Sequence, residues 1–238
     1  MFTIWKRDLL GYFRTPIGYA FSGVFLSLAG LIFYLFNIRY LTSDILAYMN
    51  QLTTLLMLLS PLLTMRLLSE ERQKKTDQLL FTSPISLTKI VVGKYLAAST
   101  VLFITLLLSQ AYMLVIASYG RLYLGEWLAG YIGFFMQGLS FLALDLLVSS
   151  FAKNQITGAV AAFGANFFLW MIDMLSTSTT GIVADIISFL SLYSRYQPFV
   201  LGQLSISSLF YYLCFIIACL LITIRILDAR RFNQGGAA

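Results

Sequence analysis

The chain has 238 residues, of which 59% are hydrophobic and 11% charged, and its formal net charge is +6 at pH 7. The mean hydropathy of +0.84 excludes an ordinary soluble domain and indicates a membrane protein. Because the chain contains no histidine, imidazole catalysis and histidine-liganded metal sites are also excluded.

Residues 1–15 are too polar to span a bilayer but fit an amphipathic helix. At about 100° per residue the apolar side chains share one face, and the basic side chains lie away from its centre. The apolar set is Phe2, Trp5, Leu9, Tyr12 and Phe13. This pattern predicts an interfacial helix in contact with membrane lipids, followed by a bend at Pro16. The alternative is a helix docked on the bundle of the protein itself.

Six runs of at least 18 residues lack any charged side chain, and runs of about this length cross a bilayer. They predict transmembrane helices at residues 17–38, 45–66, 90–118, 127–150, 155–173 and 206–227. We therefore expect an all-α polytopic membrane protein with a single transmembrane domain over residues 1–238.

Lysine and arginine predict the orientation, since cytoplasmic loops are enriched in them. With the N-terminus inside, 13 of the 16 basic residues lie on the cytoplasmic side, and only Arg39, Arg121 and Arg195 lie outside. Both termini are thus expected in the cytoplasm, with residues 228–238 as a tail. The positive net charge follows from topology, and no binding to nucleic acid is expected.

Residues 69–88, between the second and third spans, form the longest cytoplasmic segment and carry the densest charge. Six charged side chains occur among the eight residues 70–77, and leucine pairs flank them. Ser69 is expected to cap one short helix, and Thr76 or Asp77 a second. The segment therefore predicts a helical insert with a mixed-charge surface.

Residues 176–205, between the fifth and sixth spans, are apolar in pieces too short to cross the membrane. The uncharged runs 174–184 and 186–194 have 11 and 9 residues. Such runs predict short re-entrant or interfacial helices on the extracellular side.

Few polar side chains lie within the spans. The candidates for a transport pathway are Gln110, Gln137, Asp145 and Asn166. Asp145 and also Asp173 lie near span ends, where each is either a solvated helix end or part of a relay for protons or substrate. The amides either bond a neighbouring helix or line a path.

The fifth span carries small residues that let another helix approach closely. They are Gly158, Ala161, Ala162 and Ala165. The partner helix belongs either to this chain or to a second permease subunit.

No nucleotide site of the P-loop type occurs in the sequence. Gly93 and Lys94 end like that motif, but Thr88 stands where its first glycine is required. No metal cluster or pairing of nucleophile and base is found either, which disfavours an intramembrane enzyme.

The stretch "SEERQKKTDQLLFTSPISLTKIVVGKYLAA", residues 69–98, resembles the cytoplasmic loop of type-2 ABC transporter permeases. The matching positions are Glu70, Glu71, Leu79, Leu80, Ser83, Pro84, Gly93, Lys94, Leu96 and Ala97. Lys75 and Gln78 depart from the usual pattern. Residues 11–21 and 191–232 are similar to the branch of gliding-motility and nitrous-oxide-reductase-maturation permeases.

This resemblance implies an exporter in the bacterial cytoplasmic membrane, powered by a separate cytoplasmic ATPase that binds ATP and magnesium. The chain itself would be non-catalytic and hold no cofactor or metal. The ATPase would dock on a coupling helix formed by Glu70, Glu71, Arg72, Lys74, Lys75, Thr76, Asp77, Leu79 and Leu80.

The resemblance also implies a second permease subunit, identical or different, and it is compatible with an accessory extracytoplasmic protein. The alternative function is a membrane anchor or force-transmitting subunit of an ATPase complex that moves no solute.

Overall fold

The computed structural model describes residues 1–73, 86–119, 123–178 and 191–235, and all regular structure in these ranges is helical. The long helices are α2 (Pro16–Phe33) with its continuation η1 (Tyr34–Ile38), α3 (Ile45–Thr64), α6 (Leu87–Tyr119), α7 (Leu124–Phe151), α8 (Gln155–Ser178) and α11 (Ile206–Gly235). Six helices are long and apolar enough to cross a membrane, which confirms the predicted all-α polytopic fold. Helices satisfy every backbone hydrogen bond within one segment, as a bilayer requires.

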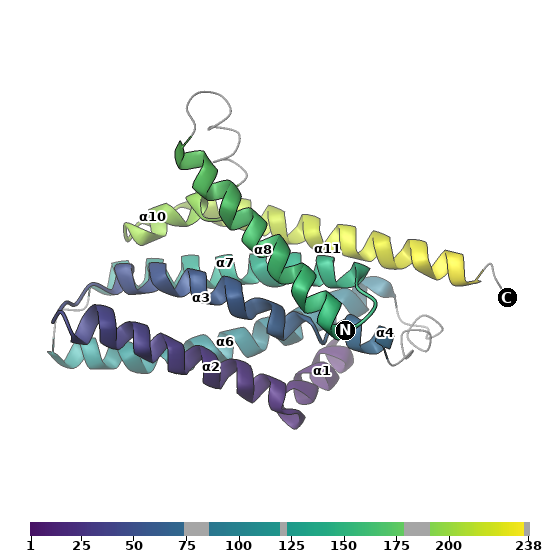
Figure 1. Cartoon of the computed structure of the whole chain (residues 1–238), viewed down its shortest axis with the longest axis horizontal. Helices are drawn as coiled ribbons and strands as arrows, with labels where there is room; N and C mark the ends of the chain where they lie inside the picture. Colours follow the sequence, from purple (N-terminus) through teal and green to yellow (C-terminus); the bar gives the residue numbers. More distant parts are fainter. Residues whose placement is uncertain (74–85, 120–122, 179–190, 236–238) are drawn as a thin grey trace.

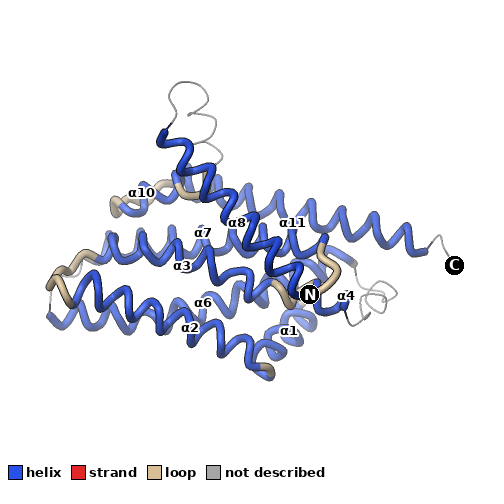
Figure 2. Tube along the Cα trace, viewed as in Figure 1, coloured by secondary structure: helices blue, strands red, loops and turns tan. Residues whose placement is uncertain are grey.

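Helices α3 and α7 form the centre of the bundle (Figure 1). Helix α3 packs against α2, α7 and α8, and α7 also packs against α11. Helix α8 crosses the other spans obliquely, and α11 runs along one edge. The chain termini and the short helix α4 (Ser69–Gln73) lie toward one end of the bundle, and the turn from α2 to α3 lies at the opposite end (Figure 2).

Local sequence explains where the helices begin and end. Pro16 occupies the first position of α2, and Thr15 before it is extended, with φ −110° and ψ 158°, which gives the expected bend. The Asp44 side chain accepts a hydrogen bond from the Ala47 amide at 2.9 Å and caps α3. Helix α11 continues to Gly235, so most of the predicted tail at 228–238 is helical.

Helix α1 (Phe2–Arg14) packs against α6 and α2. Ile4 and Tyr12 are buried in the bundle, and the Trp5 indole donates to Thr100 Oγ1 at 3.0 Å. Phe2, in contrast, is 70% exposed. Most of the apolar face of α1, which the sequence assigns to contact with lipid, thus packs on the helix bundle of the protein itself.

Short helices η2 (Ser194–Tyr196) and α10 (Gln197–Val200) precede α11. Phe199 is fully buried, and it lies against Gly133 of α7 so closely that a Cβ on this glycine would be 2.6 Å from Phe199 Cβ. Residues 191–205 therefore contain short helices, but these begin only at Ser194, at the end of the second of the two runs in which they are predicted. Residues 174–178 belong to α8, and residues 179–190 lie outside the described part of the chain.

Asp173 joins this segment to α8. Its Oδ1 accepts hydrogen bonds from the hydroxyls of Ser191 and Ser194, the latter at 2.8 Å. Asp173 therefore holds residues 191–194 against the C-terminal part of α8.

Replacing Gly133 with alanine is expected to displace Phe199 and loosen α10, because no space exists for the added methyl group. Overpacking of this kind destabilises a protein by about 1–3 kcal/mol. A lower melting temperature of the detergent-purified protein, followed by tryptophan fluorescence, checks this. Gly23→Ala is the control, since a Cβ at Gly23 of α2 meets nothing within 4 Å. Equal melting of both variants and the wild type contradicts the close contact.

Candidate functional site

The predicted docking surface begins in α4, at the end of the bundle that holds both termini. The structure describes Glu70 and Arg72 with their side chains, and Glu71 as part of the helix. The other predicted docking residues lie outside the described ranges; they are Lys74, Lys75, Thr76, Asp77, Leu79 and Leu80. We call α4, with the adjoining ends of α3, α7 and α8, the α4 junction.

Arg72 fastens α4 to the end of α7. Its Nη1 donates to the carbonyl of Ala152 at 2.8 Å and to that of Phe151 at 3.3 Å. Arg230 of α11 donates to the preceding carbonyl, that of Ser150. The last carbonyls of a helix lack partners within it and carry partial negative charge. Two arginines from distant parts of the sequence therefore satisfy the end of α7.

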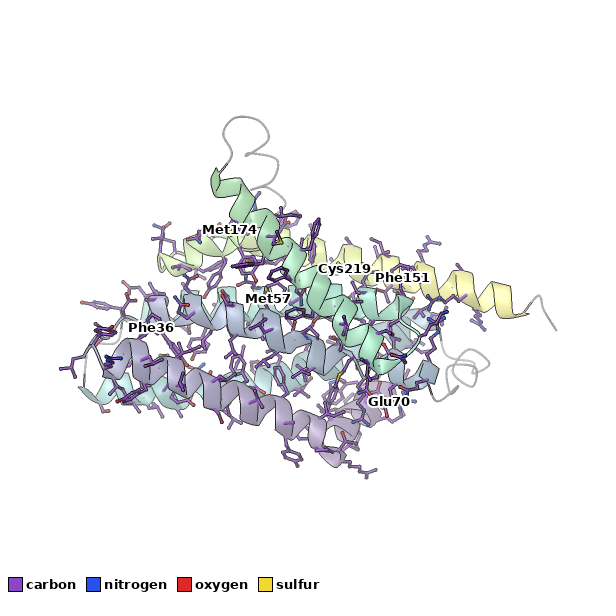
Figure 3. The ribbon with its side chains drawn as sticks, in the orientation of Figure 1. Phe36, Met57, Glu70, Phe151, Met174 and Cys219 are labelled. Carbon is purple, nitrogen blue, oxygen red and sulfur yellow. The ribbon has the colours of Figure 1, made fainter. Side chains whose placement is uncertain are left out.

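Ser69 makes a second contact between α4 and the same region. Its hydroxyl lies 2.7 Å from that of Ser149 in α7, and both side chains are buried. The hydroxyl therefore bonds another helix, where the sequence suggests a cap. Gly158 of α8 packs directly on Ser69, since a Cβ there would lie 2.5 Å from Ser69 Oγ. Helix α4 is thus in contact with the first turn of α8 as well (Figure 3).

The turn between α7 and α8, residues 152–154, has its own local lock. Ala152 is extended, with φ −70° and ψ 146°, and ends α7. The Thr157 amide donates to Asn154 Oδ1 at 2.8 Å, and the Asn154 amide donates to Thr157 Oγ1 at 3.3 Å. This reciprocal pair caps the start of α8 and fixes the geometry of the turn.

Arg66 connects the junction to α1. Its Nε lies 2.8 Å from Glu70 Oε2, and its Nη1 donates to the Gly11 carbonyl at 2.8 Å and to the Thr15 hydroxyl. Glu70 is thus an internal partner of the junction as well as part of the charged loop. At least one charged side chain of the predicted docking surface, that of Glu70, therefore forms an ion pair within the chain itself.

Tyr12 makes a second link from α1 to the end of α3. Its hydroxyl donates to the Leu63 carbonyl, and the Arg66 guanidinium lies 5.9 Å from the ring centroid. Burial, with a smaller effect of Asp8, raises the pKa of the Tyr12 phenol, so the hydroxyl stays protonated and able to donate.

The motif at Gly93 and Lys94, which ends like a P-loop, has a structural role. Gly93 lets α1 approach α6, because a Cβ there would lie 3.1 Å from Ile4 Cγ2. Lys94 is 2% exposed, and its Nζ lies 3.3 Å from Asp8 Oδ2 of α1. Tyr95 then donates to the Leu139 carbonyl of α7 at 3.0 Å. These residues hold α1, α6 and α7 together.

The four candidate pathway residues separate into different surroundings. Asn166 Nδ2 of α8 donates to Asp145 Oδ1 of α7 at 2.8 Å and to Ser60 Oγ of α3 at 3.2 Å. Asp145 is fully buried, so the interpretation as a solvated helix end is wrong. Gln110 accepts a bond from the Trp127 indole at 3.1 Å, and the Gln137 amide, also fully buried, has no hydrogen-bond partner among the described residues.

The small residues of α8 face in two directions. Gly158 and Ala162 are buried against the chain itself, Ala165 is half-buried, and Ala161 is exposed. Gly158 and Ala162 therefore contribute to packing within the chain, and only the outward side of α8 is open to a second subunit.

No group of three or more His, Cys, Asp or Glu side chains that could hold a metal occurs among the described residues. A cavity of about 280 Å³ lies near η1, which continues α2, and Asn37, Leu41 and Val115 contribute to its lining. None of the four candidate pathway residues lines it.

The family described as ABC-2 family transporter protein matches residues 35–233 of the chain. The matched range runs from the end of α2 into the last turns of α11 and contains the α4 junction. A comparison with curated proteins gives no match.

Replacing Asn166 with leucine is expected to destabilise the fold by about 1 kcal/mol or more, because it leaves the buried Asp145 carboxyl without its donor. In an Asp145→Leu background the same substitution is expected to have a much smaller effect. Unfolding of the two single variants and the double variant in mixed micelles measures this coupling. Strictly additive effects would show that the two side chains do not interact.

Proposed function

Because the chain belongs to the ABC-2 family of transporter proteins, and is thus a membrane subunit of an ABC transporter, we propose that it is the permease of an exporter. A separate ATPase would dock on residues 69–88 and drive it. The observation that carries this proposal is the α4 junction. The charged segment begins in a short helix that is bonded to the ends of other spans, as a segment that transmits movement requires.

Energy for transport would come from the partner subunit. The sequence has no histidine and no P-loop, since Thr88 replaces the glycine that a phosphate-binding loop needs. ATP and magnesium are therefore proposed to bind only in the ATPase. The chain would contribute the membrane path and the docking surface.

The chemistry of residues 70–77 suits recognition of a soluble protein surface. Mixed charges give orientation and specificity more than affinity. Glu70 already has an ion pair with Arg66, so Glu71, Lys74, Lys75 and Asp77 are proposed to face the ATPase. Leu79 and Leu80 would add apolar contacts.

A second permease subunit, either identical or different, is proposed to pack on the outward side of α8. That side presents exposed small and apolar residues, including Ala161, Gly164 and Phe168. Small residues favour close helix contacts in lipid. The same proposal includes four further points. They are export as the direction of transport, a place in the bacterial cytoplasmic membrane, an accessory extracytoplasmic protein, and a relationship to the branch of gliding-motility and nitrous-oxide-reductase-maturation permeases.

A force-transmitting subunit without solute transport is the second candidate. It is favoured by the bonding of the buried polar residues to one another, as in the contact of Asn166 with Asp145. Vesicles that contain the complex distinguish the two functions. ATP-dependent movement of a solute supports the exporter, and ATP hydrolysis without any such movement supports the second function.

Reversing two loop charges, Lys74→Glu with Lys75→Glu, is expected to weaken binding of the proposed partner ATPase by about tenfold, through electrostatic mismatch. Pull-down of the purified subunits in detergent gives the dissociation constant. The control is Arg39→Glu, which changes an exposed basic residue at the opposite end of the bundle. Equal affinity of the loop variant and the wild type would remove residues 74–75 from the dock.

The orientation gives a further prediction. In a Cys214→Ser, Cys219→Ser background, Ser86→Cys is expected to react with a membrane-impermeant maleimide only after the cells are permeabilised. Ser43→Cys at the opposite end is expected to react on intact cells, and both side chains are exposed. Labelling of residue 86 on intact cells would refute a cytoplasmic dock at residues 69–88.

A further inference from the structure

We propose that Arg72 and Ser69 are positioning residues that fasten α4 to the turn between α7 and α8, so that displacement of the loop reaches α8 directly. This inference rests on the proposed function, in which an ATPase moves the loop. By covalent continuity the loop is joined only to α3 and α6. The fastening supplies another route, to helices that lie about 80 residues further along the chain.

Arg72 holds the backbone of the turn rather than a side chain. Its guanidinium donates to two consecutive carbonyls, those of Phe151 and Ala152, at the point where α7 ends. A bond from a charged donor is about twice as strong as a neutral one. A displacement of α4 is therefore applied to the peptide units that connect α7 to α8.

Ser69 opposes movement of α4 both away from α7 and toward α8. Its bond to Ser149 opposes separation of α4 from α7. Its contact with Gly158 opposes closer approach, because the space between Ser69 Oγ and this glycine is already filled. Close-packed contacts of this kind transmit displacement instead of absorbing it.

Within the chain itself, helix α8 is the span best able to respond, and a second subunit packed on its outward side would move with it. Only 17% of its spanning window is buried in the described structure, the lowest share of the six spans. Its inner side is held further along by the bond from Asn166 to Asp145. A force on the first turn of α8 would therefore tilt the helix about Asn166.

The first test compares Arg72→Met with Arg72→Lys and with the matched control Lys153→Met, which removes an exposed basic residue from the same turn. Each variant is reconstituted with the proposed partner ATPase. The Arg72 guanidinium is used inside the junction, on the carbonyls of Phe151 and Ala152, and is therefore removed from the predicted docking set. Arg72→Met is expected to bind the ATPase within about twofold of the wild type, while the stimulation of ATP hydrolysis by the permease falls about tenfold. Arg72→Lys is expected to restore most of it, since one donor can still reach Ala152, and Lys153→Met to leave it unchanged.

Amide hydrogen exchange of the permease alone provides a readout that does not depend on the ATPase. Arg72→Met is expected to raise exchange in residues 152–158, and Lys153→Met is not. Unchanged exchange there, or wild-type stimulation by Arg72→Met, overturns the inference. A third outcome separates the inference from the proposed function. If Arg72→Met raises exchange in residues 152–158 but the wild-type permease does not bind the ATPase, the inferred contact of α4 with the turn stands and the proposed function is refuted.

A disulfide tests whether α4 and the turn move as one body. In the background without native cysteines, Ser69→Cys with Ser149→Cys is expected to cross-link, because the two hydroxyl oxygens lie 2.7 Å apart. The control pair Ser22→Cys with Thr105→Cys joins α2 to α6 across the same 2.7 Å. Stimulation of the ATPase is expected to survive the junction cross-link. Loss of stimulation that a reductant reverses, or cross-linking of the control pair alone, overturns the inference.

Discussion

The arrangement of the junction depends on one constraint, that the C-terminal carbonyls of α7 need hydrogen-bond donors. Of the six spans α7 is the most buried, with 61% of its spanning window inside the described structure, and the last carbonyls of a helix have no partner within it. Arg72 and Arg230 supply the donors from α4 and α11. An unsatisfied buried carbonyl costs about 1–3 kcal/mol. Satisfying the end of one helix therefore brings two others, α4 and α11, to the place where the charged loop begins.

Close approach, rather than apolar burial alone, holds the remaining contacts. Lipid tails are as apolar as leucine, so helices in a bilayer associate through tight packing and hydrogen bonds. Gly133 receives Phe199 of α10, Gly158 receives Ser69 of α4, and Gly93 receives Ile4 of α1. In each case a segment that does not span the membrane is held on a spanning helix by the absence of a side chain. These three contacts fix the positions of α10, α4 and α1 on the bundle.

Much of the fold could be predicted because bilayer thickness sets the length of a span, and uncharged runs reveal it. The site was less predictable, since contacts such as Arg72 with Ala152 join residues 80 positions apart that no local pattern relates. Asp145 looked like a solvated helix end because the sequence gives its distance from the end of a span and not its neighbours. The signal that sequence reasoning missed is spacing. Asn166 lies eight residues after Gly158 and four after Ala162, and residues at this spacing share one face of a helix. A polar side chain beside these small residues indicates that this face of α8 points into the bundle.

The connections of Arg66 extend the junction to α1. Arg66 holds Glu70 of α4 on one side and the end of α1 on the other, and Tyr12 of α1 bonds the last turn of α3. Helix α1 is also fixed to α6 through Asp8 and Lys94. A force on the loop would thus be resisted at α1, which is attached to two spans, and transmitted at α8, which is the least buried. That difference gives the movement a direction within the chain, because a span with a small buried share has less surrounding protein to resist a displacement.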